Sequence, residues 1–490
     1  IQAPDLKSTR AQALLLGKAN VVDSLLRIVV PIVLVRLLDV EDYGYYVLFW
    51  LITTTVTLIA PFGMVRSLLY FIPRSTRSEK EAFVSQTVYW MVFAALLSAL
   101  AVSQWNPVLP DNIKNLSSYG MLMPSFIFLW VLSSLIEFLP SADQNISWQA
   151  GAIIGLALTR NIVIVAAAYF SRNLEIIFFV LLVFALLKLT VLLYYIVTIY
   201  GVGGLIPRFS MLPKQLKYAV PFGLSGIFYN LRSRVGQWIV ALMFQPGSFA
   251  VFSIAISINM IANVLRNSMG NVIVPTMSQS EGGGDHERVL QLNNRANIAI
   301  SSILFPFASF VFVFAGLVVE VLYTDSYLEA VPVVRIYLIG TIIMAVEVGN
   351  VLVVLRQGTF VLKVSAILLA VSLLAAYYGA LLMGTSGVAF AAVASTLVGV
   401  FFNYRQVSKL TGKPLRDLQD WPMLMKLLVA SIVASIIALA VCNILAGSWS
   451  LPLQLFVSGV IFVPAYLGIL FLTGCGWIIG TLLGRREWAG

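Results

Sequence analysis

The sequence predicts an all-α integral membrane protein with about fourteen transmembrane helices. Hydrophobic residues make up 60% of the 490 residues, and charged residues only 11%. The apolar residues gather in long blocks, and most blocks reach the roughly 20 residues that a helix needs to cross a bilayer. The connections between blocks are short and leave no room for a soluble domain of useful size. These observations exclude an ordinary soluble protein.

Each expected span follows an apolar block between charged or turn residues. The first block has no small-residue cleavage site and leads directly into a second span, so we expect a retained helix there instead of a signal peptide. The expected spans cover approximately residues 14–37, 43–71, 83–104, 119–139, 147–170, 175–199, 216–243, 249–275, 297–319, 330–354, 359–381, 386–404, 427–446 and 452–476.

The net charge of +10 could suggest a nucleic-acid partner, but its distribution indicates a membrane. With the N-terminus inside, most basic residues fall on the cytoplasmic side, and only Lys114 and Arg172 fall in external loops. This bias is the usual signature of cytoplasmic loops. We therefore expect a multi-pass protein with both termini in the cytoplasm, a lipid bilayer around it and no nucleic-acid partner.

Cysteine and histidine are too few for a metal site or a catalytic triad. Cys442 and Cys475 lie in late apolar blocks, and the single histidine, His286, lies in a polar loop. Neither a disulfide framework nor metal-ligand spacing is present. We expect no cofactor, no metal and no enzymatic activity.

A weak internal repeat divides the chain. Residues 42–46 resemble residues 248–252, and Ile72-Pro73-Arg74 resembles Val274-Pro275-Thr276. Six spans are an even number, so the two copies start on the same side and an axis along the membrane normal relates them. We expect a six-helix lobe at residues 1–205, a second at 206–410 and two further helices at 411–490, with cargo bound between the lobes.

Several expected spans carry an arginine near their middle. Each such charge costs roughly 2.5–3.5 kcal/mol on the mildest insertion scale, so these side chains are expected to face a wet cavity. Guanidinium groups stay charged when buried and grip phosphate in a bidentate manner, which suits an anionic cargo. The candidate cargo-binding arginines are Arg27, Arg66, Arg160, Arg232, Arg234 and Arg266.

Other interpretations of these charges stay open. Asp23 stands one turn before Arg27, so the two could simply neutralise each other. Arg66 could extend toward the cytoplasm after the Pro61-Phe62-Gly63 break, while Arg160 and Lys188 could each pair with an acid. Asp23 and Glu347 are candidate ion-coupling residues, and Glu347 could equally balance an arginine.

A polar stripe marks the eighth expected span. Asn259, Asn263, Asn267 and Asn271 recur every four residues, which places them on one face of a helix beside Arg266. Lipid contact would leave their amides without partners. We interpret Asn259, Asn263 and Asn267 as cavity-lining residues that bind cargo; the alternative is hydrogen bonding between packed helices.

Four segments resemble the polysaccharide-repeat-unit flippases, the Wzx-type transporters of the superfamily that also contains MurJ-type lipid II flippases and MATE exporters. The segments are PIVLVRLLDVEDYGYYVLFW at 31–50, FGMVRSLLYFIPR at 62–74, LKYAVPFGLSGIFYNLRSRVGQWIVALMFQPGSFAVF at 216–252 and VLYTDSYLEAVPVVRIYLIG at 321–340. The similarity covers most of the chain, with degenerate motifs that identify a family and not a cargo.

The resemblance implies two six-helix lobes around a cationic cavity, with alternating access. The implied activity is ion-coupled translocation of polyprenyl-pyrophosphate-linked oligosaccharide from the inner to the outer leaflet of a bacterial or archaeal cytoplasmic membrane. It places Arg27, Arg66, Arg234 and Arg266 at the family's usual cavity cations, and it makes a glycan polymerase a candidate partner.

Three alternatives differ in class. A MurJ-type lipid II flippase would have a Ser-Arg-containing pattern that the first span lacks. A MATE-type exporter of organic cations would favour acids and apolar walls, whereas the expected spans of this chain carry more bases than acids. A membrane enzyme of glycan assembly would need a large external loop or a catalytic histidine.

Overall fold

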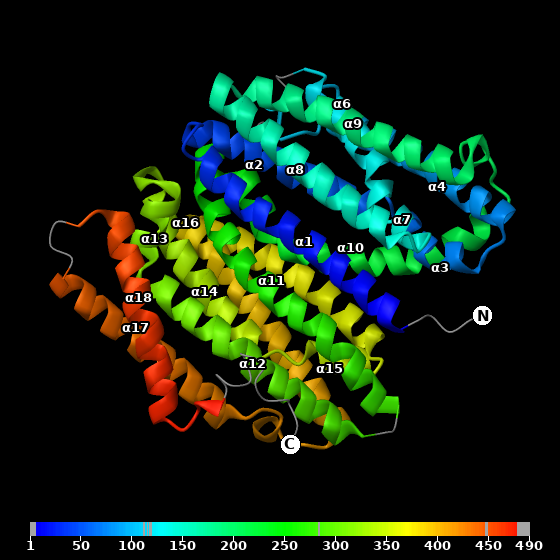
Figure 1. The fold of residues 1–490 in the computed structure, drawn as a ribbon. Coiled ribbons are helices and arrows are strands. Elements are labelled where there is room, and N and C mark those ends of the chain that lie inside the picture. Colours follow the sequence, from blue (N-terminus) through cyan, green and yellow to red (C-terminus); the bar gives the residue numbers. More distant parts are fainter. Residues whose placement is uncertain are drawn as a thin grey trace. The chain divides into compact units, whose positions relative to one another are not determined.

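The computed structural model describes residues 6–110, 113–114, 116, 120–282, 285–445 and 449–477; for residues 6–14 and several positions between 222 and 282, it describes the backbone alone. Within these ranges the chain is almost entirely helical and contains no strand, which confirms the predicted all-α class (Figure 1). Two compact units form, Ile1–Ala250 and Val251–Gly490. The three-part division at residues 205 and 410 stays a prediction.

The first unit consists of long helices joined by short turns. In it, α1 packs along α8, while α6 contacts both α4 and α9. Phe49 connects three helices in the core of this unit. Its ring centroid lies 4.7 Å from that of Phe126 in α6 and 4.5 Å from that of Phe178 in α9. The elements are α1 (Leu6–Leu34), α2 (Val40–Ile59), α3 (Met64–Phe71), η1 (Ile72–Arg74), α4 (Arg77–Ala101), α6 (Leu122–Ser133), η2 (Ser134–Glu137), α7 (Leu139–Ala142), α8 (Ile146–Ser171), α9 (Leu174–Tyr200), η3 (Val202–Gly204) and α10 (Leu212–Met243).

A sharp break separates α2 from α3, where the sequence contains Pro61-Phe62-Gly63. The two helices are bent by 48°. Proline cannot donate the helical hydrogen bond, and Gly63 takes a φ of +82°, which glycine tolerates best. A Cβ on Gly63 would lie 2.2 Å from the carbonyl oxygen of Ala219 in α10. The break therefore lets α3 approach the backbone of α10 closely.

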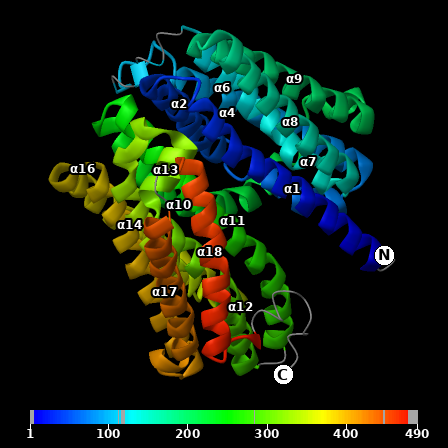
Figure 2. The ribbon, with the colours of Figure 1, turned by 60° about the vertical axis from the view of Figure 1, so that its left-hand side comes forward.

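The second unit is built around α12, which packs against α14 and α17. In turn, α16 packs on α14, and α18 lies along α17 in both ribbon views (Figures 1 and 2). Its elements are the part of α11 (Pro246–Gly282) from residue 251 on, α12 (His286–Val313), α13 (Ala315–Tyr323), η4 (Asp325–Ala330), α14 (Val331–Ala345), α15 (Gly349–Val354), α16 (Gly358–Thr411), η5 (Leu415–Asp417), α17 (Trp421–Leu445) and α18 (Leu451–Leu472).

Two helices of the second unit are interrupted. Between α14 and α15, residues 346–348 leave the helical path within one expected span. Gly384 has a φ of +61° and a ψ of −143° inside α16, so this element is two helices joined at a kink. The expected spans 359–381 and 386–404 lie on either side of that kink.

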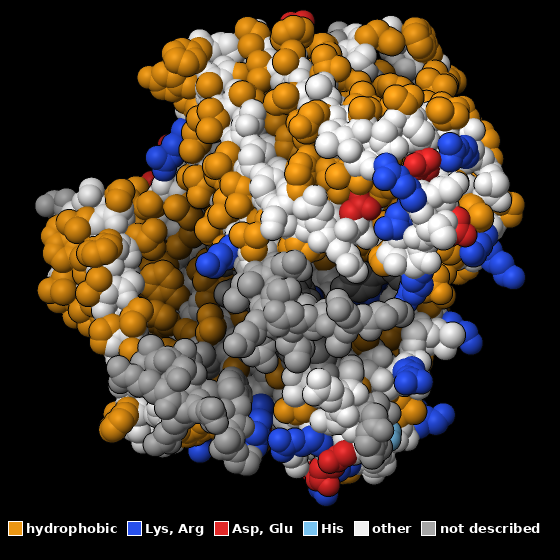
Figure 3. All heavy atoms as spheres, turned by 45° about the vertical axis from the view of Figure 1, so that its right-hand side comes forward, with side chains coloured by type: hydrophobic (Ala, Val, Ile, Leu, Met, Phe, Trp, Pro, Cys, Tyr) orange, Lys and Arg blue, Asp and Glu red, His pale blue; other side chains and the backbone are white. Residues whose placement is uncertain are grey.

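The membrane-spanning character of the chain agrees with the prediction. The described residues contain nine helices that are long and apolar enough to cross a bilayer, and the bent α2–α3 pair makes a tenth candidate. Large apolar side chains cover much of the surface (Figure 3), as at Phe179 of α9, which is 55% exposed. Such surfaces fit contact with lipid. The exact number of fourteen spans stays a prediction.

Replacing Gly63 by alanine is expected to destabilise the protein by roughly 2 kcal/mol or more, because the new Cβ meets the Ala219 carbonyl in a backbone conformation that alanine rarely adopts. Gly155→Ala is the matched control, since Gly155 lies in α8 with no atom near its Cβ position. We expect this control to stabilise slightly. Thermal unfolding of the detergent-purified variants measures both effects, and equal melting temperatures would contradict the close approach at Gly63.

Candidate functional site

In the first unit, one carboxylate holds two arginines. Asp23 Oδ2 accepts hydrogen bonds from Arg27 of the same helix, with Nη2 at 2.7 Å. Its Oδ1 lies 3.2 Å from Nη2 of Arg160 in α8. Arg160 is 13% exposed in its side chain and Arg27 is 53% exposed. The predicted neutral Asp23–Arg27 pair is therefore a three-membered cluster with one positive charge in excess.

Two tryptophans hold the buried cations of this unit. The Cζ of Arg160 lies 5.7 Å from the ring of Trp50, and Nζ of Lys188 lies 4.1 Å from that of Trp130. The two indole rings meet edge to face at 5.3 Å. Aromatic faces attract cations, so Trp50 of α2 stabilises Arg160 of α8, and Trp130 of α6 stabilises Lys188 of α9.

Lys188 has its own counter-ion. Its Nζ lies 2.7 Å from Oε1 of Glu137, in the short turn that follows α6. Lys188 is 5% exposed and Glu137 is 48% exposed in their side chains. The sequence raised pairing with an acid for both Arg160 and Lys188, and both pairs are present.

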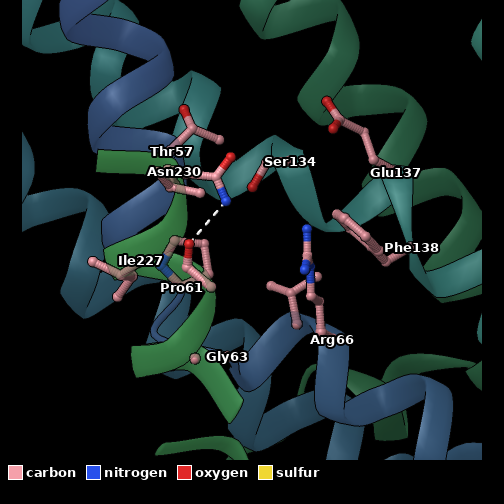
Figure 4. Close-up of a pocket in the computed structure, with 13 residues that line it drawn as sticks. Thr57, Pro61, Gly63, Arg66, Ser134, Glu137, Phe138, Ile227 and Asn230 are labelled. Atoms are coloured by element: carbon pink, nitrogen blue, oxygen red, sulfur yellow. Dashed lines mark hydrogen bonds between the residues drawn. The ribbon is translucent and has the colours of Figure 1, made fainter. Parts of the chain in front are cut away.

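A pocket of about 100 Å³ lies beside the α2–α3 break (Figure 4). Arg66, in the first turn of α3, reaches into it toward Ser134, Glu137 and Phe138. The Arg66 Cζ is 5.9 Å from the Phe138 ring. No carboxylate of the described residues lies within ion-pair distance of Arg66, whose side chain is exposed. Arg66 is thus a cation with room beside it for an anion.

Neutral polar groups surround the rest of this pocket. Asn230 of α10 donates from Nδ2 to the carbonyl of Gly226 at 2.8 Å, which leaves its side-chain oxygen available as an acceptor. The hydroxyl of Ser134 donates to the carbonyl of Val131 at 2.6 Å. Thr57 contributes a third polar side chain. These groups can exchange hydrogen bonds with an uncharged polar ligand.

The paired arginines of α10 differ in their surroundings. Arg234 donates from Nη1 to the hydroxyl of Thr54 in α2 at 2.7 Å, and Trp238 donates from Nε1 to Thr55 at 3.2 Å. Both contacts fasten α10 to α2. Arg232 is half-buried and forms no ion pair with a described acid. Cargo binding by either residue stays a prediction.

In the second unit, Arg266 pairs with Glu347. Its Nη1 lies 2.5 Å from Oε2 of Glu347, which is the balancing interaction that the sequence left open. Asn259 accepts a hydrogen bond from the hydroxyl of Thr341 in α14 at 2.5 Å, so at this position the stripe connects two helices. The side chains of Asn263, Asn267 and Asn271 lie outside the described residues.

Sequence reasoning missed two features of the first unit. The tryptophan pair was one: nothing in the spacing of Trp50 and Trp130 predicts that each faces a cation. The other is a buried glutamine node, in which Gln215 of α10 donates from Nε2 to Ser67 at 2.8 Å and contacts Gln86. Both features depend on residues more than fifty positions apart, which no local pattern connects.

The first unit therefore carries an excess of positive charge within its membrane part. Arg27, Arg66, Arg160 and Lys188 stand against the carboxylates of Asp23 and Glu137, so two positive charges remain uncompensated in this cluster. The described part of the chain contains no cluster of three His, Cys, Asp or Glu residues that could hold a metal ion. An anion is the ligand that this charge balance favours.

A family model described as "Polysaccharide biosynthesis protein" matches residues 33–332. No curated protein matches the chain by sequence. Among solved structures, a lipid II flippase MurJ in an inward closed conformation is 14% identical in sequence to this chain, with a TM-score of 0.69. The match covers 93% of this chain and 99% of the MurJ chain.

Two MATE transporters are also similar in structure. An inward-facing multidrug-resistance transporter of the MATE family and MOP superfamily is 13% identical with a TM-score of 0.64, over 80% of this chain and 96% of its own. A MATE transporter of Vibrio cholerae is 12% identical with a TM-score of 0.55, over 84% and 99%. These likenesses establish the fold of the chain.

Breaking the Lys188–Glu137 pair is expected to have unequal effects from its two sides. Glu137→Gln leaves a buried ammonium without its counter-ion and should cost about 3 kcal/mol or more, whereas Lys188→Met leaves a half-exposed carboxylate that water can solvate. The double variant should recover most of the loss. Thermal unfolding in detergent tests this; additive losses in the double variant would show that the pair is not coupled.

Proposed function

The chain belongs to the polysaccharide biosynthesis protein family, and we propose that it is a membrane flippase for a lipid-linked cargo. The cargo is a polyprenyl-pyrophosphate-linked oligosaccharide repeat unit, translocated from the inner to the outer leaflet of the cytoplasmic membrane. The protein acts as a transporter and not as an enzyme. A glycan polymerase that uses the delivered repeat units is its expected partner.

The uncompensated charge of the first unit carries this proposal. A pyrophosphate linkage brings at least two negative charges into the membrane, and two positive charges of the cluster lack a counter-ion. Arg66 is the leading phosphate ligand, because it reaches into a pocket and is free of described acids. Arg27, which shares Asp23 with Arg160 and is half-exposed, is the second.

The neutral groups of the pocket have a separate role. Asn230, Ser134 and Thr57 can accept hydrogen bonds from the first sugar hydroxyls, because the Ser134 and Thr57 hydroxyls already donate to backbone carbonyls. The polyprenyl chain stays in the hydrocarbon core of the bilayer during translocation, so no apolar surface is moved into water. Arg232, Arg234, Arg266 and the asparagines Asn259, Asn263 and Asn267 are further cargo ligands of this proposal.

Transport requires that the cargo stabilise one conformation more than another. The α2–α3 break is a hinge at which such a change could occur, because Arg66 follows it in the first turn of α3. A phosphate that binds Arg66 would then shift α3 relative to α2. Asp23 and Glu347 are the proposed coupling residues, because each carboxylate is bound to an arginine that cargo would engage.

Lipid II flipping is the second candidate. The MurJ structure shares the fold, and its named cargo belongs to the same chemical class of lipid-linked glycan. Export of organic cations is disfavoured, because an excess of positive charge repels such cargo.

Arg66→Gln is expected to weaken binding of a polyprenyl-pyrophosphate glycan roughly tenfold or more, the usual effect of losing one charge-assisted hydrogen bond to phosphate. Arg66→Lys should retain part of the affinity. Native mass spectrometry of lipids that co-purify with the protein, together with glycan export in cells, measures the loss.

Arg77→Gln is the matched control, since Arg77 is an exposed arginine of the same unit with a side chain 82% exposed. It should leave both readouts unchanged. Recovery of bulk phospholipid alone from the wild-type protein, or normal export by a folded Arg66→Gln variant, would refute the proposed function.

A further inference from the structure

The break between α14 and α15 is held in place by side chains from two other helices. The carbonyl of Val346 accepts a hydrogen bond from the hydroxyl of Tyr404 in α16. The carbonyl of Glu347 accepts one from Nδ2 of Asn297 in α12 at 3.1 Å. Backbone groups freed by a helix break must find such partners within an apolar span. The backbone of Glu347 is thus fixed by hydrogen bonds that do not involve its carboxylate.

The carboxylate of Glu347 engages Arg266 through one contact only. Oε2 of Glu347 lies 2.5 Å from Nη1 of Arg266, whereas the Nε of Arg266 is buried and has no partner among the residues that the structure describes. Arginine and a carboxylate commonly form two parallel bonds. This guanidinium therefore keeps an unused donor, and its side chain is 19% exposed against 31% for Glu347.

Gly349 gives the Glu347 carboxylate its space. A Cβ at Gly349 would lie 2.9 Å from Oε1 of Glu347, too close unless the carboxylate moved. The carboxylate thus lies over the first residue of α15, and it can take this position because Gly349 has no side chain.

We propose that Glu347 is a specificity-determining residue that occupies Arg266 in place of a phosphate group and admits only strongly charged cargo. This inference rests on the proposed function. A membrane is full of phospholipids with one negative charge, and a bare arginine would bind their phosphates. A singly charged lipid gains little by displacing a carboxylate of equal charge, whereas a pyrophosphate, with at least two charges and more acceptor oxygens, gains more.

The exchange moves no covalent bond. The cargo phosphate takes the Nη1 of Arg266, and the carboxylate of Glu347 turns away toward its exposed side. Because the backbone carbonyls of the break stay bound to Tyr404 and Asn297, the helix break itself need not change during the exchange.

The test compares two lipids of different charge. Detergent-purified protein is titrated with farnesyl pyrophosphate and with dioleoylphosphatidylglycerol, and native mass spectrometry gives the dissociation constant of each. Wild-type protein should prefer the pyrophosphate. Glu347→Gln should reduce this preference about tenfold, mainly by tightening phosphatidylglycerol binding. Gly349→Ala, which displaces the carboxylate without removing its charge, should shift the preference in the same direction by a smaller factor.

Two controls separate the outcomes. Glu329→Gln removes an exposed acid of the same unit and should leave the preference unchanged. Arg266→Gln should weaken pyrophosphate binding. An unchanged preference in Gly349→Ala and in folded Glu347→Gln, with pyrophosphate binding still dependent on Arg266, would overturn this inference alone. Failure of the wild-type protein to bind farnesyl pyrophosphate would overturn the proposed function as well.

Discussion

A cation inside an apolar span needs a carboxylate, an aromatic ring or water beside it. The structure of this protein depends on which of these partners each cation has. Lys188 and Arg160 are buried, each with a carboxylate and an indole face, so they add fixed connections between helices. Arg66 and Arg27 are exposed and only partly compensated. The buried cations thus have a structural role, and the exposed ones are those that the proposed function assigns to cargo.

Helix breaks stand next to the charges that are candidates for function. Arg66 follows the break at residues 61–63, and Glu347 lies within the break at residues 346–348. A break interrupts the rigid helical ladder and changes the direction of the side chains that follow it. It also frees backbone groups, which Asn297 and Tyr404 satisfy in the second unit. Each break thus brings a charged side chain next to an interruption of the helical hydrogen bonds.

Local signals explain which parts the sequence predicted. The all-α class, the bend at Pro61 and the Asp23–Arg27 contact depend on hydropathy, on proline and on a spacing of four residues, all of which are visible in the chain itself. The partners of Arg160, Lys188 and Arg266 are 137, 51 and 81 residues away, so only tertiary packing determines them. The same holds for Asn259, whose bond to Thr341 connects two helices, the alternative to cavity lining that the sequence left open.

The size of the Arg66 pocket limits what it can recognise. A volume of about 100 Å³ is smaller than the roughly 300–1,000 Å³ of pockets that enclose a whole small-molecule ligand. On the proposed function, a phosphate of the cargo would reach its arginine while the sugars lie outside the pocket. Recognition of the charged linkage is then separate from accommodation of the sugars. On the proposed function, such a transporter would select cargo by the group that all its repeat units share, and the same arginines would serve glycans of different composition.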